Sequence, residues 1–313
     1  MEFYSQDPSL NSQLQSCLAQ LALDRPGLLE QISVTWLVYE GAPLDLAAGL
    51  EATDLWNLPW RGAGHNSNQL RYPASVVKLF YAAALEAWMA RDLLPDGQEL
   101  RRAMADMLAH SSNDATGLVV DLLSGTTSGP ELPADPLASW ARQRQLVNRW
   151  FADLGWPEWG DCNACQKTWS EGPYGRERQF YGEDRQNRNR LSTDVTARLL
   201  HALMSGAWLS PLASARLRQL LQRSLDADQR LADPENQVDG FIGEALPEGS
   251  RLWSKAGWMS EARHDAAYCE VPQCPPFLLV VFSEGESQAK DLKLLPGLCS
   301  KLIACLSQPL QAS

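Results

Sequence analysis

The 313-residue sequence predicts a mixed α/β (α+β) fold. Strands from both ends of the chain form one sheet, and a helical lobe is inserted between them. Segments rich in β-branched and aromatic residues lie near the two ends of the chain. The middle of the chain is dominated by segments with helical spacing of apolar residues. The composition, 45% hydrophobic and 21% charged, is that of an ordinary globular protein with a sizeable core.

The predicted sheet draws on five segments. Its first strand has the sequence ISVTWLVY, and the second is expected to pair back on it across the turn Gly41-Ala42-Pro43. The strand with the sequence FLLVVFS is nearly all apolar, which is typical of a central strand. We expect residues 51–71, which are rich in glycine and asparagine, to form a loop. The five strands are predicted at residues 32–39, 44–50, 251–255, 263–270 and 277–283.

Helices are predicted on either side of these strands and between them. Periodicity fails over residues 155–190, and a stretch of this length without regular structure is usually a functional loop or an Ω-loop. We therefore expect a sheet lobe from residues 1–72 and 236–313, and a helical lobe from 73–235. The helices are predicted at residues 9–30, 75–88, 99–109, 113–123, 137–154, 194–205, 211–225 and 286–306, with breaks at Pro26-Gly27 and Pro296-Gly297.

Charge and cysteine content exclude several classes of function. The formal net charge of −11 argues against a nucleic acid or an anionic membrane as partner, because both need clustered cations. The segment from Met1 to Leu10 has no cationic or apolar region of a secretory signal, and no apolar run approaches the length of a membrane span. The seven cysteines cannot form a complete disulfide framework. We expect a cytoplasmic protein with reduced thiols.

The first candidate site is Ser75-Val76-Val77-Lys78, at the start of a predicted helix. Lys78 lies one turn after Ser75 on the same helix face, because residues i and i+3 are neighbours. A serine hydroxyl is a weak nucleophile that needs a base. A lysine removed from water loses its proton near neutral pH and can act as that base. The motif predicts Ser75 as nucleophile and Lys78 as general base.

The second motif, Ser111-Ser112-Asn113, directly precedes the helix predicted at 113–123. Serine and asparagine are preferred at helix N-caps, so a purely structural role explains the motif on its own. In a catalytic site, Ser111 would relay a proton, and Asn113 would hold a substrate amide carbonyl and the Lys78 ammonium.

The third motif, Lys255-Ala256-Gly257, ends a predicted strand and is followed by Trp258. It is either a plain strand-end turn or a binding element, in which Lys255 attracts a substrate carboxylate and Gly257 lets the substrate lie along the strand. The backbone N–H of Trp258 would then join that of Ser75 in an oxyanion hole.

The three motifs occur in the order S-x-x-K, S-x-N and K-x-G, each on the kind of element that its role requires. Over residues 32–306 the chain therefore resembles the class A β-lactamase and penicillin-recognising serine hydrolase family. The resemblance implies a β-lactamase/transpeptidase-like fold with an antiparallel five-stranded sheet and an all-helical lobe. It further implies a Ser75 acyl-enzyme, formed from an amide bond of the β-lactam type or from an ester of a small anionic substrate, with no metal or cofactor.

The sequence departs from the family's motifs at several positions. Ser112 stands where the family has an aspartate, Ala256 lacks the usual substrate-binding hydroxyl, and Trp258 is bulkier than the common residue. Class A enzymes also carry a loop glutamate that activates the deacylating water. Its counterpart here would lie in the loop 155–190.

Three glutamates in this loop are candidates for that role. The number of residues before the predicted helix start at Ser192-Thr193 favours Glu177. The segment Trp169-Ser170-Glu171 is similar to the family's Trp-Glu pattern, which favours Glu171. The third candidate is Glu183. Each is also explained as a solvated loop residue. Without such a glutamate, an acyl-enzyme would turn over slowly.

Other readings of the sequence remain open. A cytosolic amidase, esterase or peptidase of the same fold, with no antibiotic role, fits the absence of a signal. A catalytically silent binding scaffold fits the departures at Ser112 and Ala256. Two cysteine pairs have spacings compatible with a zinc site, although ordinary thiols explain them as well: Cys162 with Cys165, and Cys269 with Cys274.

Overall fold

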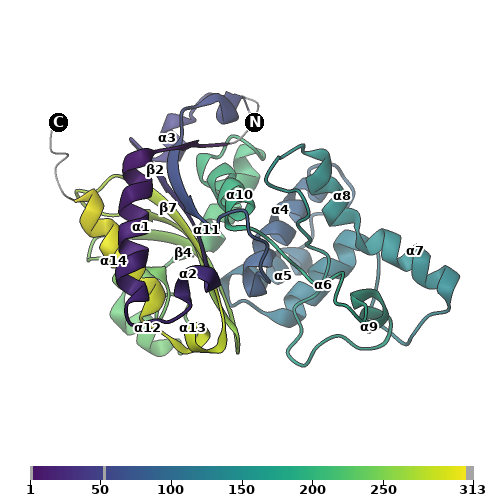
Figure 1. Ribbon diagram of the computed structural model, residues 1–313. Coiled ribbons are helices and arrows are strands. Elements are labelled where there is room, and N and C mark those ends of the chain that lie inside the picture. Colours follow the sequence, from purple (N-terminus) through teal and green to yellow (C-terminus); the bar gives the residue numbers. More distant parts are fainter. Residues whose placement is uncertain (1–2, 52–53, 308–313) are drawn as a thin grey trace. The chain divides into compact units, whose positions relative to one another are not determined.

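The computed structural model describes residues 3–51 and 54–307, and divides the chain into two compact units (Figure 1). The first unit comprises the chain up to Gln69 and from Ser192 onward, and the second comprises Leu70–Leu191. The sequence predicts a helical lobe that extends to residue 235. The chain instead rejoins the sheet unit at Ser192, because α10 (Thr193–Ser205) packs on strands of the sheet.

The first unit is built on a sheet with the strand order β1-β3-β2-β7-β6-β5-β4. The expected five-stranded antiparallel sheet is matched only in part: five strands pair antiparallel, but one of them lies at Arg61–His65 and not at 44–50. One two-residue strand is added at each edge, so the sheet has seven strands. The sheet is mixed, because β1 pairs in parallel with β3. Strands this short leave no periodic signal in the sequence. The strands are β1 (Ser5–Gln6), β2 (Ile32–Val38), β3 (Arg61–His65), β4 (Gln222–Arg223), β5 (Arg251–Met259), β6 (Ala262–Glu270) and β7 (Phe277–Glu284).

The predicted second strand at residues 44–50 is wrong. A short helix, α3 (Pro43–Leu46), begins there, and β2 pairs instead with β3, which lies in the predicted loop. The sequence of β3, RGAGH, lacks the side chains of a typical strand because the backbone needs glycine. A Cβ on Gly62 would lie 2.5 Å from the side chain of Leu37 and 2.7 Å from the carbonyl oxygen of Trp36.

Both faces of the sheet are covered. Alternate residues of β2, such as Val34 and Trp36, join a buried apolar cluster with α1 (Pro8–Ala22) and α14 (Leu294–Leu306), which pack against each other (Figure 1). On the opposite face, the Thr35 hydroxyl donates to Oδ1 of Asp194 and lies 2.9 Å from the hydroxyl oxygen of Thr193, at the start of α10. Every residue of β2 is therefore buried, which explains its apolar sequence.

The remaining helices of this unit divide more finely than we predicted. The stretch 9–30 forms α1 and α2, and the expected break at Pro26-Gly27 lies between them. The stretch 286–306 divides before Pro296, which lies in the first turn of α14, where proline is tolerated. These helices are α2 (Leu28–Gln31), η1 (Asp54–Asn57), α11 (Pro211–Leu221), α12 (Ala227–Ala232), η3 (Ile242–Ala245) and α13 (Glu286–Lys290).

The second unit is helical and is centred on α4 (Lys78–Met89), all of whose residues are buried. The predicted helix 137–154 is interrupted at Gln145. The loop 155–190 is closed at its base by paired backbone hydrogen bonds between Asn163 and Arg190, at 2.8 and 2.9 Å, and it contains a short helix. The helices around α4 are η2 (Ala74–Val77), α5 (Gln98–Ala109), α6 (Asn113–Ser124), α7 (Ala134–Arg144), α8 (Leu146–Asp153) and α9 (Gly175–Tyr181).

None of the helices in the described ranges combines the length and the apolar character needed to cross a bilayer.

Candidate active site

Ser75 lies on η2, the single 3₁₀ turn that leads into α4. The preceding residue, Ala74, has a φ of 46°, in the left-handed region that residues with a side chain seldom adopt. Such a backbone costs roughly 1–3 kcal/mol and persists only where its surroundings hold it. Ala74, Val76 and Val77 are buried whereas Ser75 is half-buried, so the turn leaves the serine accessible.

Lys78 begins α4 and is completely buried. Its Nζ donates to the backbone oxygen of Ser111 (2.5 Å) and to Oδ1 of Asn113 (2.9 Å), and lies 3.2 Å from Oγ of Ser111. Burial lowers the pKa of the Lys78 ammonium to about 7, because a charged amine loses its hydration there. At neutral pH, a large fraction of Lys78 is therefore uncharged.

Ser111 approaches Lys78 through an unusual backbone conformation, with a φ of 57°. Its neighbour Ser112 is the N-cap of α6, and its hydroxyl accepts a hydrogen bond from the N–H of Ala115 (3.1 Å). The motif thus supplies a helix cap and two residues in contact with Lys78. Ser112 caps the helix, while Ser111 and Asn113 reach the lysine.

This geometry suits a proton acceptor. A neutral amine has two hydrogens and one lone pair. The carbonyl oxygen of Ser111 and the amide oxygen of Asn113 can accept the two hydrogens of Lys78, which leaves the lone pair for a hydroxyl proton.

The third motif lies in the first unit, on β5. Lys255 is completely buried, and its Nζ donates to Oε1 of Gln237 (2.6 Å) and to the carbonyl oxygen of Ala256 (2.8 Å). Ala256 belongs to the buried apolar cluster of the sheet, so its methyl group packs in the core. Gly257 and Trp258 continue the strand and pair with β6, and Trp258 is partly exposed.

A buried carboxyl group lies beside this motif. Asp265 on β6 pairs with Ala256, and burial raises its pKa to about 7, against the opposing charges of Arg223 and Lys255. Its Oδ2 accepts a hydrogen bond from the N–H of Ile242 (3.1 Å). Lys255 thus belongs to a buried polar group that lies within the first unit.

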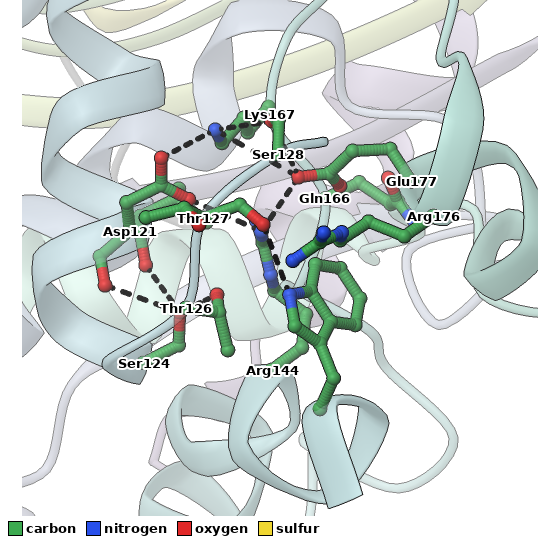
Figure 2. A network of polar contacts seen from close by, with 12 residues as sticks. Asp121, Ser124, Thr126, Thr127, Ser128, Arg144, Gln166, Lys167, Arg176 and Glu177 are labelled. Atoms are coloured by element: carbon green, nitrogen blue, oxygen red, sulfur yellow. Dashed lines mark hydrogen bonds and ion pairs between the residues drawn. The ribbon is translucent and has the colours of Figure 1, made fainter. Parts of the chain in front are cut away.

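The structure places Glu177 in a different set of contacts (Figure 2). Its buried Oε1 accepts from Nη2 of Arg144 (2.6 Å) and Oγ of Ser128 (2.8 Å), and lies 3.7 Å from Nζ of Lys167. Arg144 and Lys167 also pair with the two oxygens of Asp121, at 3.1 and 2.6 Å. Two cations balance two carboxylates, and the network ties α9 to α6 and α7.

The other two loop glutamates are exposed. Glu171 lines a cavity of about 580 Å³ that Asn113 also lines, whereas Glu183 is not among the residues lining that cavity. The structure therefore joins Lys78, Ser111 and Asn113 in direct contact, and places Glu171 and Glu177 in other surroundings of the same unit.

Sequence reasoning missed Lys167, Arg144, Asp121 and Gln237. The first three lie far apart in the chain and make no recognisable motif, although a lysine within the tryptophan-rich loop was a usable signal. Gln237 lies in an irregular segment between α12 and η3, and no sequence pattern points to it.

The two cysteine pairs considered for zinc fall in different units. Within residues 3–51 and 54–307, no group of three or more histidine, cysteine, aspartate or glutamate side chains is arranged to hold a metal ion.

Solved structures of the same architecture include several β-lactamases. A β-lactamase from Xanthomonas campestris pv. campestris has a TM-score of 0.62 at 15% identity, over 96% of this chain and 99% of its own. The protein PBP-A has a TM-score of 0.61 at 14% identity, over 96% and 97% of the two chains. A β-lactamase from Chitinophaga pinensis has a TM-score of 0.62 at 16% identity, over 95% and 98%. The fold is thus that of the β-lactamases and PBP-A.

The chain itself belongs to the β-lactamase enzyme family, whose model matches residues 94–304. The matched region includes the second and third motifs and begins after Ser75 and Lys78. No curated protein matches the sequence.

Proposed function

We propose that this protein is a serine hydrolase that acts through a Ser75 acyl-enzyme on an amide bond of the β-lactam type or on an ester. Family membership and fold support a serine hydrolase of this superfamily. The observation that carries the proposal is a buried lysine with a pKa lowered to about 7, one helical turn after an accessible serine.

In the acylation step, neutral Lys78 takes the hydroxyl proton as Oγ of Ser75 attacks the substrate carbonyl carbon. The carbonyl electrons move onto oxygen in the tetrahedral intermediate. They then return and expel the leaving group, which is an amine from an amide and an alcohol from an ester. Ser111, whose Oγ lies 3.2 Å from Nζ of Lys78, passes the proton from the lysine to that leaving group. Asn113 orients both the lysine and the substrate amide.

Binding and charge stabilisation fall to the third motif. We assign to the backbone N–H of Trp258 a donor role toward the developing charge of the intermediate, because preorganised donors stabilise it. Gly257 leaves room for a substrate beside the strand, and the cation of Lys255 attracts an anionic substituent. Ala256 packs in the core and has no hydroxyl, so Lys255 attracts the anionic substituent without the second contact that is usual in the family.

The fate of the acyl-enzyme depends on water activation, the role expected for Glu177. The contacts of Glu177 with Arg144 and Ser128 support a role in anchoring the loop instead, because its carboxylate is completely buried and Oε1 is held in an ion pair with Arg144. We therefore propose that acylation is followed by slow hydrolysis.

Labelling with a fluorescent penicillin tests the nucleophile. The unchanged protein should be labelled covalently, whereas Ser75→Ala should not be labelled at all. Turnover of nitrocefin, compared with that of a panel of small esters and peptides, identifies the bond that is cleaved. Equal labelling of Ser75→Ala would overturn the assignment.

A further inference from the structure

Two thiols meet where the first and the last helix of the described chain pack together (Figure 1). The Sγ atom of Cys17, on α1, lies 3.9 Å from that of Cys305, on α14, and neither cysteine is in a disulfide. The two residues are 288 positions apart in the sequence. The contact therefore links the two ends of the first unit, on the helices that cover one face of its sheet.

The contact belongs to a regular antiparallel pairing of the two helices. One turn after Cys17, Oε1 of Gln20 accepts a hydrogen bond from Nζ of Lys301 (2.8 Å). Lys301 lies one turn before Cys305, so the sequence rises along one helix as it falls along the other. Residues three or four apart share a helix face, and both cysteines thus lie on the faces that α1 and α14 turn toward each other. A contact that involves no sulfur atom therefore supports the same register.

The two thiols differ in their access to solvent. Cys17 is 5% exposed and belongs to the buried apolar cluster, whereas Cys305 is half-buried. Burial and the neighbouring sulfur of Cys305 raise the pKa of the Cys17 thiol to about 11, against the opposing charge of Lys301. The thiolate is the form of cysteine that reacts, and Cys17 keeps its proton at neutral pH. Cys305 is therefore the thiol that a dissolved oxidant meets first.

We propose that Cys17 and Cys305 are a site of reversible oxidation, at which oxidised glutathione or a similar small disulfide converts the two thiols into an intramolecular disulfide. The bond requires the sulfur atoms to approach to about 2.05 Å. The two atoms are already in contact on facing helices, so rotation of the two side chains supplies the rest of the approach. The inference is independent of the proposed hydrolase, because neither cysteine takes part in that reaction.

The oxidation proceeds by two thiol–disulfide exchanges. In the first, the thiolate of Cys305 attacks one sulfur of oxidised glutathione, the glutathione disulfide bond breaks, and one glutathione leaves as a thiolate that takes up a proton. In the second, Cys17 gives its proton to water and attacks Sγ of Cys305, which breaks the mixed disulfide and expels the second glutathione. The two cysteines together lose two electrons and two protons, and one oxidised glutathione is reduced to two thiols.

Other cysteines of the first unit lie near α14 in different surroundings. Cys269 and Cys299 are completely buried in the apolar cluster, where a dissolved oxidant does not reach them. Cys274 is half-buried, as Cys305 is, and its Sγ lies 4.0 Å from the hydroxyl oxygen of Ser307. Cys274 is therefore a matched control, since it is a thiol of similar access that contacts a hydroxyl.

The test treats the folded, reduced protein with oxidised glutathione, blocks the remaining thiols and maps the disulfides by mass spectrometry without reduction. We expect the peptides that contain Cys17 and Cys305 to be linked. The link closes a loop that holds most of the chain, so the Tm should rise by about 3–6 °C and fall again after reduction with dithiothreitol. Cysteines that stay unlinked, a glutathione that stays on Cys305, or a link between other cysteines overturns the proposal.

Variants separate this link from other effects of the oxidant. Cys17→Ser should keep a glutathione on Cys305, because the second exchange has lost its thiol, and its Tm should not rise on oxidation. Cys305→Ser changes the half-buried position, so it carries the comparison if the buried substitution prevents folding, and its Tm should not rise either. Cys274→Ser should form the link and gain the same rise in Tm as the original protein. A rise in Tm that persists in Cys305→Ser overturns the proposal.

Discussion

The amide oxygen of Asn113 lies 2.9 Å from Nζ of Lys78, although the two residues begin different helices 35 positions apart in the sequence. Together with the carbonyl oxygen of Ser111, it fixes the direction of the buried amine. Burial lowers the pKa of this amine to about 7. The arrangement holds a lysine ready to accept a proton at neutral pH.

The pH dependence of acylation follows from this lowered pKa. Only neutral Lys78 accepts the Ser75 proton, and the neutral fraction rises with pH through about 7. The rate of covalent labelling should therefore rise across this range and level off above it. Stopped-flow labelling at a series of pH values measures the midpoint. A profile that keeps rising to the usual pKa of a solvated lysine would contradict the proposed state of Lys78.

Removal of the amine should abolish this behaviour. Lys78→Met keeps an unbranched side chain of nearly the same length in the buried position but has no base, so we expect acylation to slow by about 100-fold or more. The exposed Lys290→Met is a matched control that should leave the rate unchanged. An acylation rate within threefold of the original would show that another group takes the proton.

Ser112 should matter for stability and not for chemistry, because its hydroxyl caps α6. Ser112→Ala should lower the free energy of unfolding by about 1 kcal/mol. Ser112→Asp, which introduces another good cap, should restore it, and both variants should be acylated at the original rate. Urea unfolding and penicillin labelling measure the two effects. Loss of acylation in Ser112→Ala, with stability unchanged, would assign a catalytic role to this hydroxyl.

A substitution at Glu177 distinguishes a role in anchoring the loop from a role in activating water. Its carboxylate is completely buried against Arg144, and breaking a buried ion pair of this kind costs about 3 kcal/mol. Glu177→Gln should therefore lower stability, while the lifetime of the acyl-enzyme stays the same. The lifetime is measured by intact mass after excess reagent is removed. A much longer lifetime, without loss of stability, would restore Glu177 as the residue that activates water.

The glycine-rich strand β3 gives a further test. A Cβ at Gly62 would meet the backbone oxygen of Trp36 at 2.7 Å, which a flexible side chain cannot relieve. Gly62→Ala should lower the free energy of unfolding by about 1–3 kcal/mol. The control is Gly297→Ala in α14, where a Cβ makes ordinary contact with Leu21 at 3.6 Å and should stabilise the helix slightly. Equal stabilities of the two variants would contradict the close approach of β2 and β3.

The sequence predicted the parts of the site that depend on local geometry. Ser75 and Lys78 are three residues apart at a helix start, and Ser111 and Asn113 flank a helix cap, so their spacing alone indicates a common face. The strand β7 is also predictable from its own sequence, because a strand buried on both faces is nearly all apolar.

Other features depend on contacts between distant residues and leave no local pattern. Gly62 suggested a loop, because the close approach of β2 that requires a glycine there is visible only in three dimensions. The ion pair of Glu177 with Arg144 joins positions 33 residues apart. Spacing from the next helix therefore suggested a catalytic position for a residue that the fold places in an ion-pair network.

The central claim is that Ser75 forms an acyl-enzyme, and intact-mass spectrometry after incubation with a β-lactam tests it most directly. We predict a single adduct with the mass of the intact β-lactam, mapped to Ser75, that forms in the original protein, is lost only slowly and is absent from Ser75→Ala. An adduct of the same mass and yield on Ser75→Ala, or no adduct on the original protein with any β-lactam or ester probe, would contradict the account.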